Sequence, residues 1–170
     1  EMVGTKIMSF LEAGFTSADC KALLDHYNMA MCSVVDIAHV ERTDRESVER
    51  MQKEAHIFSK FAQDVGCPSI QLVPLCAHEG KSWDEVKRLT ASSVNRVLDI
   101  GAEYGIGFQL EPVAWSPIHS LSQSLEFIDY TGRKNFGMVI DFWHLWYGNE
   151  TTPDEVAALD PSMIRNIHFD

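Results

Sequence analysis

Three stretches in the last third of the chain share one pattern, in which a short apolar run ends in a polar side chain. They are Phe108–Glu111, Met138–Asp141 and Ile164–His168. A short apolar run bounded by turn residues is typical of a buried strand in a parallel sheet. The runs end roughly 30 residues apart, which leaves room for one helical crossover between successive strands. The polar ends should therefore lie together at one edge of the sheet, where barrels and doubly wound folds carry their chemistry.

The rest of the chain extends the same alternation of strands and helices. Strands are expected near 30–37, 69–75, 107–111, 138–142 and 164–168, with helices between them. Capping boxes at Ser82 with Glu85 and at Ser120 with Gln123 predict two of the helix starts. This alternation predicts one α/β domain over residues 1–170, either a flavodoxin-like sheet or part of a (β/α)8 barrel. No glycine-rich nucleotide-binding loop is present in the sequence.

Composition excludes several classes of partner. The 170 residues carry a net charge of -11, which argues against nucleic acid because nucleic-acid binders usually present a basic face. The apolar runs are far shorter than the roughly 20 residues of a membrane span, so no membrane partner is expected. The four cysteines form no CxxC pair, and we expect buried, reduced thiols in a cytoplasmic protein at Cys20, Cys32, Cys67 and Cys76.

The three strand-end residues suit a divalent metal. Two carboxylates and an imidazole, from Glu111, Asp141 and His168, favour a hard or borderline ion such as Mn²⁺, Mg²⁺ or Co²⁺ over structural zinc. Trp115 and Trp143 stand near the same strand ends and could stack on a sugar ring. His78 follows an earlier strand and could face the same cleft.

The motifs L-E-P at 110–112, I-D-x-W-H at 140–144 and I-x-x-x-H-F-D at 164–170 resemble the sugar phosphate isomerase/epimerase family with a xylose-isomerase-like TIM barrel. The resemblance covers most of the chain and implies a parallel (β/α)8 barrel, here incomplete with about five strands. It implies that Glu111, Asp141 and His168 bind a divalent metal, Mn²⁺ first, with Mg²⁺, Co²⁺ or Zn²⁺ as alternatives. It also assigns His144 to substrate orientation.

The implied activity is that of a sugar or sugar phosphate isomerase or epimerase, or a dehydratase of the same family. Proton abstraction, with Glu111 as the base, would give a metal-stabilised enediolate. The family's fourth ligand, a glutamate from strand 8, has no counterpart in the chain, so we expect a fragment of a longer polypeptide. The expected partner is a small sugar or polyol bound near His144, Trp115, Trp143 and His78, and a homo-oligomer is left open.

Two other functions are compatible with the sequence. An endonuclease-IV-like zinc AP endonuclease would use more histidines, including His39 and His78, and would bind three ions rather than one. A non-catalytic sugar-binding or regulatory barrel fragment would bind sugar without turnover.

Overall fold

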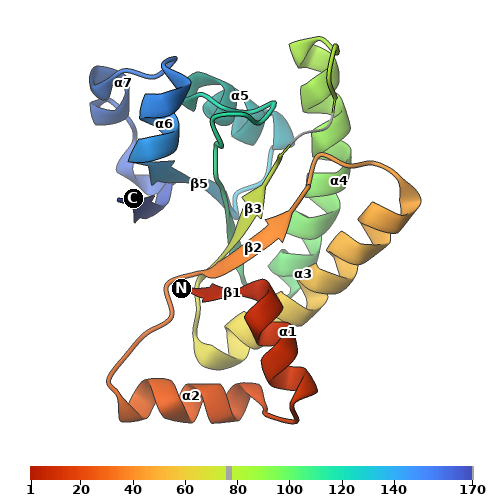
Figure 1. Ribbon diagram of the computed structural model, residues 1–170, viewed down its shortest axis with the longest axis vertical. Coiled ribbons are helices and arrows are strands. Elements are labelled where there is room, and N and C mark those ends of the chain that lie inside the picture. Colours follow the sequence, from red (N-terminus) through yellow and green to blue (C-terminus); the bar gives the residue numbers. More distant parts are fainter. Residues whose placement is uncertain (76–77, 170) are drawn as a thin grey trace.

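Six parallel strands form one curled sheet in the computed structural model, which describes residues 1–75 and 78–169 (Figure 1). The strand order follows the chain, as in the wall of a barrel, and every neighbouring pair is parallel. The strands are β1 (Met2–Val3), β2 (Val34–Ala38), β3 (Ser69–Val73), β4 (Gly107–Leu110), β5 (Phe136–Asp141) and β6 (Ile164–His168). The prediction of an incomplete parallel barrel is confirmed, with one short strand more than expected.

Helices connect the strands and cover the outer face of the sheet, where α3 and α4 lie side by side (Figure 1). The helices are α1 (Gly4–Glu12), α2 (Ser17–His26), α3 (Arg45–Val65), α4 (Trp83–Glu103), α5 (Leu121–Thr131), α6 (Phe142–Gly148) and α7 (Pro153–Ala157), and a 3-10 turn, η1, spans Pro161–Met163. None of the helices that the structure describes is both long and apolar enough to cross a bilayer.

Local signals fix where most of these helices begin. Capping boxes start α2, α4, α5 and α7, with Thr16, Ser82, Ser120 and Thr152 as the capping residues. In each, the hydroxyl accepts from a backbone N–H of the first turn while an acidic or amide side chain three residues later accepts from the cap. Helix α3 ends at Val65, and the next residue, Gly66, adopts a left-handed conformation with φ of 78°.

Side chains alternate between the two faces of the sheet. On β4, Phe108 and Leu110 are completely buried against the helices, and the Phe108 ring packs so closely on α4 that only glycine fits at Gly101. Gln109, which lies between them, and Glu111, which directly follows β4, point to the other, inner face of the curled sheet, where both bond to Gln71. The outer layer is the hydrophobic core, and the inner face carries the polar groups.

The structure corrects the expected environment of one cysteine. Cys20 and Cys67 are buried free thiols, but Cys32 is exposed because its side chain points away from the core between the buried residues Met31 and Ser33. Cys76 lies outside the described residues.

Candidate metal centre

Glu111, Asp141 and His168 meet at the carboxyl edge of the sheet; we call them the triad. Glu111 directly follows β4, and Asp141 and His168 are the last residues of β5 and β6, where they are partners in the strand register. Their candidate ligand atoms all lie within 4.8 Å of one another. His168 Nδ1 lies 2.9 Å from Glu111 Oε1 and 3.6 Å from Asp141 Oδ2. The chain thus brings together the three side chains that the sequence selects.

The triad is buried and acidic, which perturbs its proton equilibria. Glu111 is 8% exposed and Asp141 1%. Burial raises the pKa of Glu111 to about 7; the neighbouring His168 opposes this rise, whereas the charges of Asp141 and Asp36 reinforce it. For His168, burial disfavours the charged ring, but contacts with Glu1 and Glu111 outweigh burial and raise its pKa.

The donor set fits a divalent cation. Two carboxylates and one imidazole supply hard and borderline ligands, and the excess of negative charge around Glu111 would be neutralised by a dication. Among the residues that the structure describes, this triad is the one group of three or more histidine, cysteine or acidic side chains close enough to share an ion. His39 and His78 do not join it, so the additional ligands of the nuclease alternative are not assembled within the described residues.

The start of α6 fixes the orientation of Asp141. Its Oδ1 accepts from the backbone N–H of His144 at 2.8 Å and caps the helix, which leaves Oδ2 turned toward His168. The ring of His144 accepts at Nδ1 from the N–H of Ala114, at 3.4 Å, so a neutral ring carries its proton on Nε2.

Exposed aromatic rings surround His144. The Trp115 and Trp143 rings lie 5.2 and 4.9 Å from its ring centroid, each edge to face, and Tyr147 stacks on Trp143 at 5.0 Å. Trp115 is 62% exposed and Trp143 40%, although both are large apolar side chains. Aromatic faces open to solvent beside a polar site suit a ligand with an apolar ring face.

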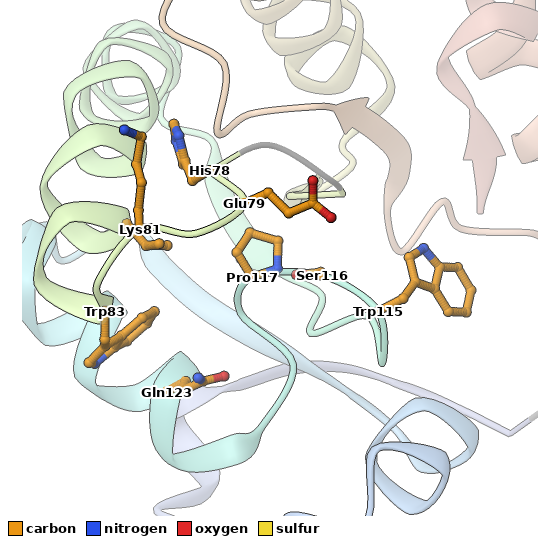
Figure 2. Close-up of a pocket in the computed structure, with 9 residues that line it drawn as sticks. His78, Glu79, Lys81, Trp83, Trp115, Ser116, Pro117 and Gln123 are labelled. Carbon is orange, nitrogen blue, oxygen red and sulfur yellow. The ribbon is translucent and has the colours of Figure 1, made fainter.

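A cavity of about 430 Å³ opens between the loops that follow β3 and β4 (Figure 2). His78 has a left-handed backbone, with φ of 76°, and its buried Nε2 has no hydrogen-bond partner among the described residues. His78 and Trp115 line this one cavity, and no residue of the triad is among its lining residues. The cavity is lined by His78, Glu79, Lys81, Trp83, Val86, Trp115, Ser116, Pro117 and Gln123.

Sequence reasoning missed two groups that contact the triad. Glu1 Oε1 lies 3.1 Å from His168 Nε2, so the curl of the sheet brings the first residue against the last strand. Gln71, on β3, donates from Nε2 to Glu111 Oε2 at 2.8 Å. The sequence contained a signal for Gln71. Polar residues alternate with apolar ones at positions 69 and 71 on β3, and again at positions 109 and 111 at the end of β4.

The chain matches one family of known proteins. A sequence model of the family described as Xylose isomerase-like TIM barrel matches residues 8–170. An inosose isomerase of Halalkalibacterium halodurans is 25% identical over 111 residues, which are 64% of this chain and 39% of that protein. A 2-oxo-tetronate isomerase of Haemophilus influenzae is 29% identical over 92 residues, 50% of this chain and 35% of that protein. The matched segments span less than half the length of these curated relatives.

Solved structures show the same fold at low identity. The IOLI protein with a binding zinc atom aligns with 99% of this chain and 61% of its own, at a TM-score of 0.88 and 16% identity. A D-allulose 3-epimerase from Methylomonas aligns with 91% of this chain and 57% of its own, at a TM-score of 0.74 and 19% identity.

Proposed function

The chain belongs to the xylose isomerase-like TIM barrel family, and from this premise we propose that it carries the metal-binding part of a sugar isomerase or epimerase. The observation that supports the proposal most is the convergence of the triad within 4.8 Å at the carboxyl edge of a parallel sheet. The names of its relatives, inosose isomerase and 2-oxo-tetronate isomerase, point to small oxygenated substrates such as sugars or polyols.

Glu111, Asp141 and His168 would hold the ion. We expect Mn²⁺, with Mg²⁺, Co²⁺ or Zn²⁺ as alternatives, because the donor set combines oxygen ligands with a single imidazole. When bound, a divalent ion would act as a Lewis acid toward substrate oxygen and would increase the acidity of the adjacent C–H bond.

The chain's own residues would then perform the proton transfer. Glu111 accepts the proton as the C–H bond breaks, and the electron pair stays on the substrate as an enediolate. Return of the proton to the neighbouring carbon gives isomerisation. Epimerisation needs a second acid that delivers a proton to the opposite face, a role that the family resemblance assigns to the strand-8 glutamate rather than to Glu111. His144, with its proton on Nε2, would orient a substrate oxygen, and Trp115 and Trp143 would pack against the sugar ring.

Solvent deuterium exchange tests this proposal directly. Protein stripped with a chelator and reloaded with Mn²⁺ should incorporate deuterium from D2O into inosose or a ketose, as followed by NMR. Glu111→Gln should abolish the exchange. Exchange at the parental rate in that variant would remove Glu111 from the role of base.

Metal stoichiometry separates the proposal from its alternatives. One ion per chain is expected from the triad. Three zinc ions per chain would favour the nuclease, and sugar binding without any metal-dependent exchange would favour the non-catalytic fragment.

A further inference from the structure

The inner face of β3 and β4 carries buried polar side chains where barrel interiors usually hold branched apolar ones. Ser69 and Gln71 are 3% and 2% exposed, Gln109 is completely buried, and Ser33, just before β2, is completely buried as well. Burying amides and hydroxyls is costly unless each finds a partner. Hydrogen bonds join these four side chains and Glu111 into one network.

The network has a fixed direction. Ser69 Oγ donates to Gln109 Oε1 at 3.1 Å, and Gln109 Nε2 donates to Ser33 Oγ at 3.0 Å and to Gln71 Oε1 at 3.3 Å. Gln71 Nε2 then donates to Glu111 Oε2 at 2.8 Å. A carboxylate only accepts, so the Gln71 amide nitrogen must face it, and the Gln71 oxygen must face the nitrogen of Gln109. A flip of either amide would set donor against donor or acceptor against acceptor.

We propose that Gln71 is a positioning residue that holds Glu111 so that a single carboxylate oxygen, Oε1, faces the metal site. This inference rests on the proposed function. Gln71 occupies Oε2, while Oε1 lies 2.9 Å from His168 Nδ1, on the side of the triad. The strand register places Gln71 beside Gln109, so the donor is anchored through two strands rather than through a flexible loop.

One-oxygen binding has a chemical consequence. A carboxylate free to rotate can bind an ion through both oxygens and take two coordination positions. Glu111 held by Gln71 takes one, which leaves the other for a substrate oxygen. Hydrogen-bond partners of metal ligands typically change metal affinity by about 10–100-fold when removed, because they orient the ligand.

The test compares two glutamine variants of matched chemistry. Gln71→Met removes the donor to Glu111, whereas Gln109→Met keeps that donor and removes only the amide that binds the Gln71 oxygen. Mn²⁺ affinity of chelator-stripped protein, measured by titration calorimetry, should fall about 10–100-fold in Gln71→Met. It should fall less than about tenfold in Gln109→Met. The visible absorption of bound Co²⁺ should change in Gln71→Met alone, since it reports the coordination geometry.

Each result decides the matter. Parental Mn²⁺ affinity in Gln71→Met, or equal losses in both variants, would overturn the positioning role. If Gln71→Met does not fold by circular dichroism, Gln71→Asn takes its place; it keeps a buried amide but withdraws the donor by one methylene, and the same loss is expected. Parental protein that binds no divalent ion would refute the proposed function and this inference together, whereas an unaffected Gln71 variant of a metal-binding protein would refute the inference alone.

Discussion

In the absence of a metal ion, the charged carboxylate of Glu111 destabilises the folded protein. Glu111→Gln should therefore raise the free energy of unfolding of the metal-free protein at alkaline pH. Burial raises the pKa of Glu111 from 4.5 to about 7. Asp141 and Asp36 add unfavourable charge nearby. The glutamine keeps the shape of the side chain, and its amide oxygen can still accept from Gln71.

The sign and size follow from linkage. Because the folded pKa lies above the unfolded one, the folded state holds the proton more tightly, and stability falls as the pH rises from 4.5 to about 7. Each pKa unit corresponds to about 1.4 kcal/mol, so the loss reaches about 3 kcal/mol above pH 7. The raised pKa of His168 acts in the same direction, because the stability it contributes is lost as the pH rises through that pKa.

Urea denaturation in chelator, repeated from pH 4.5 to 8, measures this effect. The free energy of unfolding of the parental protein should fall across that pH range, and that of Glu111→Gln should fall much less. At pH 8 the variant should be more stable than the parent by up to about 3 kcal/mol. Glu103→Gln is the matched control, since Glu103 is exposed at the end of α4, and it should follow the parental curve.

Added Mn²⁺ should remove most of the difference in stability between the two proteins. An ion at 100 times its dissociation constant stabilises the folded state by about 3 kcal/mol, and the variant should forfeit most of this gain. A variant that is less stable than the parent at pH 8 without metal would refute the reasoning, because Glu111 would then be stabilising as a carboxylate.

Three further results are expected. Asp141→Asn should keep the α6 cap, since asparagine also accepts from a backbone N–H, but it should abolish the rise in melting temperature that Mn²⁺ produces in thermal scans. His144→Ala should lower turnover at least about tenfold with Mn²⁺ affinity unchanged by calorimetry, because the ring borders the site without joining the triad. Gly101→Ala should cost about 1–3 kcal/mol in urea denaturation, since its Cβ would lie 2.1 Å from the Phe108 ring, whereas Ala102→Ser on the exposed side should cost little.

Elements with local signals were predictable from the sequence. The helix starts at Ser82 and Ser120 follow from capping boxes, because both partners lie within four residues. The meeting of Glu111 with Asp141 also follows from the sequence, since parallel strands end at a common edge. Their roles as metal ligands remain predictions.

Features set by contacts distant in sequence were not predictable. β1 has two residues, Met2 and Val3, and is a strand only because β2 lies beside it. The expected strand at 30–37 begins only at Val34, because residues 29–33 do not pair with a neighbouring strand along their length. The expected strand at 138–142 ends at Asp141, because its carboxylate caps α6 and turns Phe142 into a helical residue.

The hydrogen-bonded network on the inner face of the sheet could not be predicted from the sequence for a similar reason. Ser69 and Gln71 alternate with apolar residues on β3, but nothing local shows that their partners are Gln109 and Glu111, about 40 positions away along the chain. The strand register joins them, and register is a property of the folded sheet.

The capping boxes at Ser82 and Ser120 have a consequence for how this scaffold can change. Each capping box lies between a loop that lines the cavity and the helix that follows, α4 or α5. The hydrogen bonds of each box are formed within the first turn of that helix. The loops that precede α4 and α5 therefore end in hydrogen bonds that do not depend on the side chains of the loops. Exchanging the loop residues before these serines between related barrels should therefore leave the starts of α4 and α5 unchanged.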